Sequence, residues 1–154
     1  MVSRSLLFLP LLVLAFSPAF AQQPLRGEES GRHFCQQSVS FRLADKGRVL
    51  KRFRRFIGMW SDGAWDVRTC AALIVENVAA NGIASILYIY GPMGPDQPGP
   101  GGVLRGTGII NDGALKFDDA KGDAFSFRPG LVDLDGEMTS PDGENYRSVF
   151  KQSF

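Results

Sequence analysis

The chain has little histidine, little cysteine and little net charge, and each shortage narrows the functions it can carry. Its 154 residues include one histidine, His33, and two cysteines. A single histidine excludes most zinc-ligand sets and leaves a Ser-His-Asp or Cys-His catalytic machine without a base unless His33 supplies it. The 17 Lys and Arg residues nearly balance the 16 Asp and Glu residues, so we expect no nucleic-acid partner. We also expect no cofactor and no bound metal.

Several catalytic motifs are missing as well. There is no G-x-S-x-G nucleophile elbow, and the Gly/Pro-rich stretch 91–102 is not followed by the Gly-Lys-Ser/Thr of a phosphate-binding loop. No helical pattern of about 12 residues separates the β-rich segments, which disfavours nucleotide-binding α/β folds. An unrecognised hydrolase is the one enzymatic interpretation left open, and we expect a noncatalytic protein.

The longest apolar run, residues 6–16, lies in a segment typical of export signals. Arg4 precedes this run, and Ala19 and Ala21 occupy the small-residue positions of a cleavage site. The run is far shorter than the roughly 20 apolar residues that span a bilayer, which argues against the alternative of an uncleaved anchor. We therefore expect a signal peptide over 1–21, cleaved after Ala21, and a periplasmic or secreted protein.

Two cysteines, Cys35 and Cys70, remain after this cleavage. In an oxidising compartment an isolated pair is expected to form a disulfide, with two buried thiols as the alternative. The mature chain is long enough for one domain of ordinary size. We divide it into an N-terminal arm, 22–40, and a single barrel domain, 41–154.

An amphipathic segment, 41–57, opens the predicted domain. Leu50, Phe53 and Ile57 recur at helical spacing while the cations between them point elsewhere, and Gly58 can end a helix. The sequence favours a short basic helix here, and a strand that starts at Phe53 is the competing interpretation.

After Gly58 the pattern changes to short β-rich runs separated by turn signals. Asn81-Gly82 predicts a tight hairpin turn with positive backbone angles, and Asp135-Gly136 is interpreted as another turn, between runs 131–134 and 137–139. The spacing is typical of an antiparallel meander, so we expect an all-β fold of seven or eight strands that closes into a small barrel. Ile86, Tyr88 and Tyr90 alternate with Leu87 and Ile89, so one face should line the interior and the other should be covered by segment 41–57 or by a second subunit.

The Gly58-Met59-Trp60 sequence at the start of this meander resembles the G-x-W of the calycin group of lipocalin-like and avidin-like exported barrels. That resemblance implies that Trp60 packs across the closed end of the barrel. The outline is also similar to small periplasmic inhibitor barrels that block proteases or lysozymes. The chain departs from the lipocalin pattern in having no T-D-Y-x-x-Y segment, and it lacks the several spaced Trp residues of avidin-like proteins.

Six side chains are candidates for ligand contacts. The aromatic candidates are Trp60, Trp65, Tyr88 and Tyr90, and the charged ones are Glu76 and Arg105. Glu76 interrupts an apolar strand face; if buried it needs Arg105 or a ligand as partner, and otherwise that face is exposed to solvent. The 91–102 stretch is either a lid over the barrel mouth or a surface connection.

Charge is segregated along the chain. Residues 26–55 hold nine basic and three acidic residues, whereas 112–144 hold nine acidic and three basic ones. The simpler expectation is that the basic segment packs near the acidic turns of its own barrel. The alternative directs Arg48, Arg52, Arg54 and Arg55 toward an anionic surface.

These observations favour an exported noncatalytic protein that binds a small apolar or amphipathic ligand or an envelope component. The alternative is a periplasmic inhibitor barrel acting on a protease or a lysozyme-type hydrolase. An empty interior would favour the ligand carrier, and a filled one would favour the inhibitor or a structural role.

Overall fold

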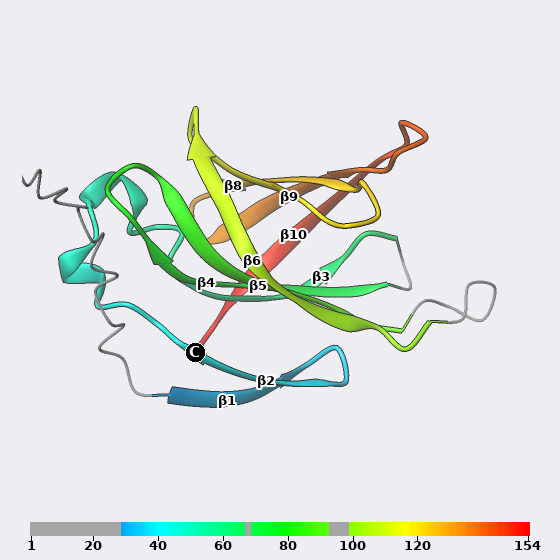
Figure 1. Ribbon diagram of the computed structural model, residues 1–154, viewed down its shortest axis with the longest axis horizontal. Helices are drawn as coiled ribbons and strands as arrows, with labels where there is room; N and C mark the ends of the chain where they lie inside the picture. The colour runs from blue at the N-terminus through cyan, green and yellow to red at the C-terminus, as the bar shows by residue number, and fades with distance from the viewer. Residues whose placement is uncertain (1–28, 67–68, 93–98) are drawn as a thin grey trace, which may run out of the picture.

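The computed structural model describes residues 29–66, 69–92 and 99–154, which form ten strands and two short 3-10 turns (Figure 1). The predicted signal peptide and residues 93–98 of the Gly/Pro-rich connection lie outside the described residues. No helix in the described part of the chain is long and apolar enough to cross a membrane. The elements are β1 (Glu29–Phe34), β2 (Gln37–Arg42), η1 (Lys46–Arg48), η2 (Lys51–Phe53), β3 (Gly58–Ala64), β4 (Cys70–Val78), β5 (Ile83–Tyr90), β6 (Gly102–Asn111), β7 (Ala114–Asp118), β8 (Ala124–Pro129), β9 (Asp133–Thr139) and β10 (Asn145–Ser153).

Strands β3 to β10 form a closed antiparallel barrel in which each strand pairs with its neighbours in sequence. The barrel closes where β10 pairs with β3, with Gln152 opposite Trp60. The turn between β6 and β7 uses two left-handed residues, Asp112 and Gly113, with φ angles of 49° and 72°. The predicted all-β barrel, with eight strands, is therefore confirmed.

The β4–β5 turn differs from the prediction in one angle. Gly82 has φ of 89° and its N–H donates to Ala79 O, but Asn81 is outside the left-handed region, so the positive angle predicted there is wrong. Instead, Asn81 Oδ1 accepts a hydrogen bond from the Ile83 N–H at 3.1 Å. The loop is thus a turn followed by one left-handed glycine, a common three-residue hairpin connection.

Segment 41–57 forms neither the predicted amphipathic helix nor a strand from Phe53. It crosses one end of the barrel in the turns η1 and η2, whose bonds link residues three apart, such as Phe53 N to Leu50 O at 2.8 Å. Phe53, Phe56 and Ile57 are buried with the interior cluster, whereas Leu50 is 43% exposed. The apolar spacing comes from residues that close a barrel end, so burial sets the conformation rather than helix propensity.

The turn predicted at Asp135-Gly136 is also wrong. Strand β9 runs through both residues, and the chain reverses at 130–132, where Gly130 N donates to Asp133 O at 2.9 Å. A Cβ atom at Gly136 would lie 2.8 Å from Phe150 and 2.9 Å from Trp65. Glycine is required here because aromatic rings occupy the space of a side chain, not because the backbone turns.

The β1–β2 hairpin lies outside the barrel (Figure 1), against the outer face of β4 and β5. Val39 and Phe41 of β2 pack there with Ile74, Leu87 and Ile89 in a cluster separate from the interior one. Of the two predicted covers, segment 41–57 and a second subunit, the segment contributes only its first residues: Phe41, with Val39, covers the face as part of the hairpin 29–42. Residues 29–40 of the predicted arm and the first residues of the predicted domain thus form one hairpin.

Candidate functional site

Trp65 and Tyr88, two of the predicted ligand contacts, lie inside the barrel and bind each other. The indole N–H of Trp65 donates to the Tyr88 hydroxyl at 2.5 Å, and both side chains are buried. Burial raises the pKa of Tyr88 well above its usual range, although the Trp65 bond acts in the opposite direction. Tyr88 is therefore a neutral phenol whose hydroxyl is already satisfied by the protein.

Aromatic rings fill the interior around this pair. The Trp65 ring lies 5.4 Å from that of Phe150 and 6.0 Å from that of Phe127, and Phe125 lies 4.7 Å from Tyr88, all measured between ring centroids. A Cβ atom built on Gly63 would lie only 2.3 Å from the Phe150 ring. At this level of the barrel, Gly63 and Gly136 are needed to fit the rings, so a ligand has no space beside Phe150.

Trp60 and Tyr90 lie toward opposite ends of the interior. Trp60 is buried and donates its indole N–H to Phe56 O at 2.9 Å, next to the segment that closes one end. Tyr90 is half-buried toward the other end, where its ring stacks on Tyr88 and Lys121 Nζ lies 5.4 Å from its centroid. These two residues belong to the packing of the barrel ends and do not share a site.

Glu76 and Arg105 lie on the other side of the wall, beneath the hairpin. Glu76 is 5% exposed, and its Oε2 accepts from Arg105 Nη1 at 2.9 Å while its Oε1 accepts from the Arg42 N–H at 3.1 Å. Arg105 Nη2 also donates to Ser40 O at 2.6 Å. The pair connects β4 and β6 to β2, which is a clamp on the hairpin. Of the two interpretations of Glu76, burial with Arg105 as partner is the one observed.

The six candidates therefore do not form one site, and strand parity explains why. Val75 pairs with Ile86, so both face the interior, and Glu76 must face outward. A register shift between Val75 and Asn77 then returns Val78 to the interior cluster. Unbroken alternation would place Glu76 and Val78 on one strand face, and the bulge puts them on opposite faces.

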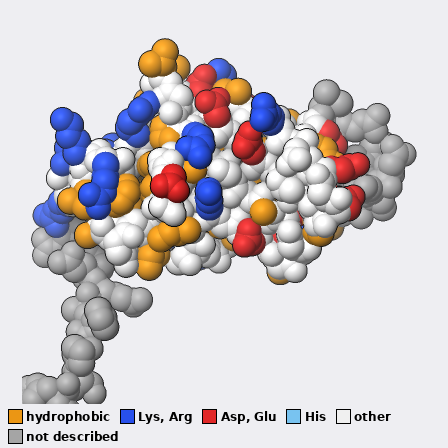
Figure 2. Space-filling view, turned by 90° about the horizontal axis from the view of Figure 1, so that it is seen from above, with side chains coloured by type: hydrophobic (Ala, Val, Ile, Leu, Met, Phe, Trp, Pro, Cys, Tyr) orange, Lys and Arg blue, Asp and Glu red, His pale blue; other side chains and the backbone are white. Residues whose placement is uncertain are grey.

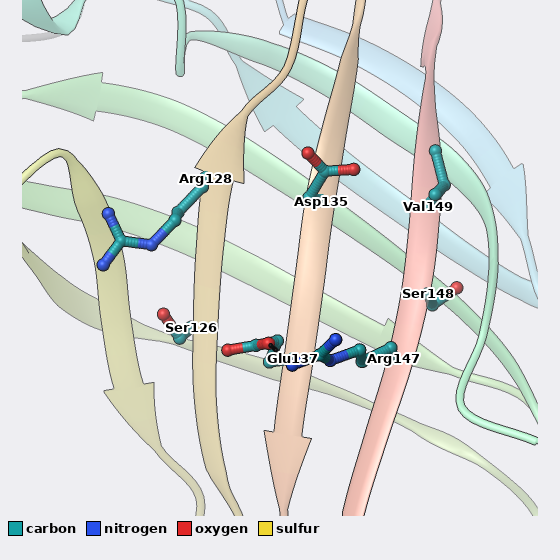
Figure 3. Close-up of a pocket in the computed structure, with 7 residues that line it drawn as sticks. All are labelled: Ser126, Arg128, Asp135, Glu137, Arg147, Ser148 and Val149. Carbon is teal, nitrogen blue, oxygen red and sulfur yellow. Dashed lines mark ion pairs between the residues drawn. The ribbon is translucent and has the colours of Figure 1, made fainter.

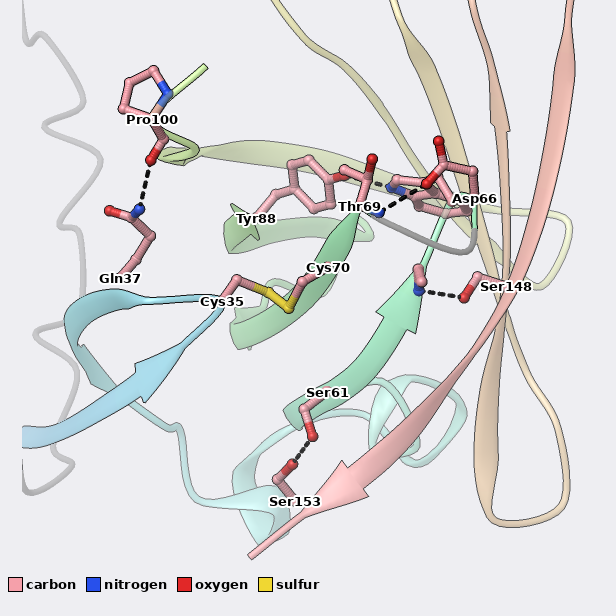
Figure 4. The surroundings of a disulfide bond; sticks show 12 residues. Cys35, Gln37, Ser61, Asp66, Thr69, Cys70, Tyr88, Pro100, Ser148 and Ser153 are labelled. Carbon is pink, nitrogen blue, oxygen red and sulfur yellow. Dashed lines mark hydrogen bonds between the residues drawn. A yellow bond between two sulfur atoms is a disulfide. The ribbon is translucent and has the colours of Figure 1, made fainter. Parts of the chain in front are cut away.

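The predicted disulfide, Cys35–Cys70, joins the hairpin turn to the first residue of β4 (Figure 4). Cys35 and Gln36 both have positive φ angles, so they form the two-residue turn between β1 and β2. Gln37 Nε2, next to that turn, donates to Pro100 O at 3.1 Å. The disulfide holds the turn of the hairpin against β4. The Glu76–Arg105 clamp holds the other end of β2, at Ser40 and Arg42.

A shallow depression of about 530 Å³ lies on the wall of β8, β9 and β10 (Figure 3). Its side chains form two rows across the strands, since Arg128 and Val149 flank Asp135 while Ser126 and Arg147 flank Glu137. Arg147 and Glu137 pair at 3.0 Å and point toward each other. This cross-strand pair stabilises the wall, while Arg128 Nη1 donates to Asp112 O at 2.9 Å.

The two ends of the barrel differ in charge. Segment 46–55 crosses one end and carries six exposed cations, Lys46, Arg48, Lys51, Arg52, Arg54 and Arg55. Arg52 Nη2 donates to Ala80 O at 3.3 Å and Arg55 donates to Gly130 O, so the segment extends from the β4–β5 turn to the β8–β9 turn. We call this surface, residues 45–57 with the turn 130–132, the basic end. Figure 2 shows blue Lys and Arg side chains gathered toward one end of the molecule.

Acidic turns occupy the opposite end. Asp119 Oδ1 accepts the N–H groups of Lys121 and Asp123, and the Ser140 hydroxyl donates to Asp142. Partial burial, and after it the nearby Asp119 charge, raise the pKa of Asp123, whereas the Ser140 bond lowers the pKa of Asp142. We call the turns 119–123 and 140–144 the acidic end.

The expected packing of the basic segment near the acidic turns is therefore wrong for these turns. Arg55 does contact the β8–β9 turn, but through the backbone oxygen of Gly130. Within the described part of the chain, Asp45 is the carboxylate that pairs with this segment, at 3.9 Å from Arg48 Nε. Arg52, Arg54 and Arg55 donate to backbone oxygens at their own end, so their charge is left facing solvent.

Neither the family models nor the curated proteins nor the solved structures that were searched contain a match to this chain. The closed eight-stranded antiparallel barrel agrees with the calycin outline that the Gly58-Met59-Trp60 sequence predicts.

Proposed function

We propose that this protein is an exported, noncatalytic binding protein that contacts an envelope component through its outer surface. The observation that carries the proposal is the packed interior, in which rings of Trp65, Phe127 and Phe150 surround Gly136 without space for one more carbon atom. A carrier of small apolar ligands needs an interior cavity instead. The Tyr88 hydroxyl, which a ligand could use, is already bound to Trp65.

Export follows from the predicted signal peptide and is compatible with the disulfide, since such bonds persist in oxidising compartments. A stapled hairpin also suits a rigid binding module. Rigid surfaces lose little conformational entropy when a partner binds.

The second candidate is an inhibitor of a protease or lysozyme-type hydrolase, and the acidic end favours it. The turns at 119–123 and 140–144 are fixed by side-chain to backbone bonds, such as Asp119 Oδ1 to Lys121 N at 2.8 Å. Pre-formed acidic turns suit a basic protein surface. An Asp119→Asn/Asp142→Asn variant should then lose inhibition of a hydrolase from the same envelope.

Native mass spectrometry of protein recovered from its own envelope tests the main proposal. We expect either the bare chain or a complex whose partner is lost when outer-surface residues are substituted. A small apolar molecule that is retained by the wild type and by all outer-surface variants would overturn the proposal, because such a molecule must lie inside the barrel.

A further inference from the structure

The basic end carries exposed apolar side chains as well as cations. Leu131 is 100% exposed and Val132 is 74% exposed, in the β8–β9 turn, and Leu50 within the basic segment is 43% exposed. A single exposed leucine needs no explanation, but adjacent ones on a basic surface are characteristic of proteins that bind at a membrane interface.

The β8–β9 turn holds these two side chains outward. Gly130 N donates to Asp133 O at 2.9 Å, which closes the turn and leaves Leu131 and Val132 at its tip. Arg55 donates to Gly130 O, so its guanidinium lies next to the tip. The geometry is a projecting apolar dipeptide with a cation at its base.

Charge at this end remains positive after its internal pairs are counted. Asp45 pairs with Arg48 and Asp133 pairs with Lys151, so two of the carboxylates there are neutralised by neighbours. The remaining cations of segment 46–55 are exposed. The acidic end lies across the barrel, so an anionic surface attracts one end of the molecule and repels the other.

We propose that the basic end docks on an anionic lipid surface, with Leu131 and Val132 entering the headgroup layer and the cations of 46–55 binding lipid phosphates. This inference rests on the proposed function and names the envelope component as lipid. A soluble polyanion would use the cations alone and would gain nothing from the apolar tip. A bilayer offers both partners at once, which is why we favour lipid over polysaccharide.

Sedimentation of the mature protein with vesicles tests the docking. We expect binding to vesicles of equal parts phosphatidylglycerol and phosphatidylcholine, weak binding to phosphatidylcholine alone, and loss of binding at high salt. Lys46→Gln/Lys51→Gln/Arg52→Gln should weaken binding on the order of 100-fold, at about fivefold per cation.

A matched charge control, Arg32→Gln/Lys121→Gln/Arg147→Gln, removes three cations outside the basic end. It should bind like the wild type, and an equal loss in both triple variants would show that only net charge matters and would overturn the docking geometry.

The apolar tip has its own test. Leu131→Ser/Val132→Ser should weaken vesicle binding about tenfold or more, whereas Val103→Ser, at the far end of β6, should leave it unchanged. Because these residues are exposed, the variants should keep the melting temperature of the wild type.

Dextran sulfate distinguishes lipid from a soluble polyanion. Equal affinity for dextran sulfate and vesicles, with no effect of the tip substitutions, would overturn the lipid assignment, as would the absence of vesicle binding. In either case, recovery of an envelope protein partner through the outer surface would leave the proposed function standing.

Discussion

Glu76 shows how one buried charge can hold two layers together. Its carboxylate accepts from Arg105 and from the Arg42 N–H, while Arg105 reaches Ser40 on the hairpin. The Arg105 side chain is 57% exposed, so water partly screens the attraction between the two charges. Arg105 stabilises the fold mainly by giving a hydrogen-bond partner to the Glu76 carboxylate, whose side chain is only 6% exposed. The clamp is therefore asymmetric: losing the arginine costs more than losing the charge of the acid.

We expect Arg105→Met to lower the free energy of unfolding by about 1–3 kcal/mol, because it leaves Glu76 with one of its two partners. Glu76→Gln should cost less, since the amide oxygen can still accept a hydrogen bond. Chemical denaturation of both variants and of the double variant measures the coupling. If the free-energy changes of the two single variants simply add in the double variant, Glu76 and Arg105 do not act together and the clamp is contradicted.

Asp123 gives a pH-dependent prediction. Its folded pKa is raised by burial, and then by Asp119, so its ionisation destabilises the folded state at neutral pH. Asp123→Asn should therefore be more stable than the wild type at pH 7. The advantage should disappear as the pH falls below about 4, where the wild-type carboxyl is protonated in both states. Thermal melts of both proteins across this range provide the test, and an advantage that persists at low pH would contradict it.

Gly136 tests the packing of the interior at one position. Gly136→Ala places a methyl group against the rings of Phe150, Trp65 and Phe127 and should cost about 1–3 kcal/mol. Gly106→Ala, on β6, is the matched control because its Cβ would meet Leu104 Cδ2 at an ordinary 3.5 Å. Equal melting temperatures for the two variants would mean that the interior has room for a methyl group at Gly136.

The hairpin β1–β2 is the element whose attachment the sequence could only partly predict. The cysteine pair predicts that residue 35 lies near residue 70, and it does. The strand pattern of β5 predicts a covered outer face, but nothing local in 37–42 identifies these residues as the cover. The cover depends on contacts between Phe41 and side chains more than thirty positions away, such as Leu87, which no local pattern contains.

Two local sequence patterns gave wrong predictions because the residues that form them are placed by burial in the barrel interior. The helical spacing of Phe53 and Ile57 and the Asp135-Gly136 pair both match standard local rules, yet both come from packing against the barrel interior. The strand count and most turns were predictable because alternation and turn chemistry are local. The separation of Glu76 from Tyr88 was not predicted, because it depends on the pairing register of β4 and β5, in which Leu73 lies opposite Tyr88 and Val75 opposite Ile86.

Removing the disulfide should release the tip of the hairpin without opening the barrel. Cys35→Ser/Cys70→Ser loses a link across 35 positions and detaches the β1–β2 turn from β4. Amide exchange should accelerate most in β1 and β2 and least in β7 to β9, which contact the interior cluster instead. Uniform acceleration throughout the barrel would contradict an independent barrel core.

Gly82→Val tests the β4–β5 turn. The substitution forces a β-branched residue to φ of 89° and places its Cβ 2.8 Å from Ile110 O, so we expect a loss of about 1 kcal/mol or more. A melting temperature equal to that of the wild type would contradict the turn geometry.

Taken as a whole molecule, the protein is a barrel with aromatic rings packed around Trp65, a basic apolar end, an acidic end and a stapled hairpin on its side. Its interior stabilises the fold, and its outer surface is what remains for binding. This division is the central claim, because a ligand carrier and an outer-surface binder differ first in whether the barrel is filled.

Binding of small apolar probes, followed by NMR, tests that claim most directly. Phe127→Ala provides the positive control, since it should open an apolar cavity that takes up benzene. We predict that the wild type shows no saturable shifts at Trp65 or Tyr88 with benzene or with a fatty acid, while the variant does. Saturable binding of either probe inside the wild-type barrel would contradict the account.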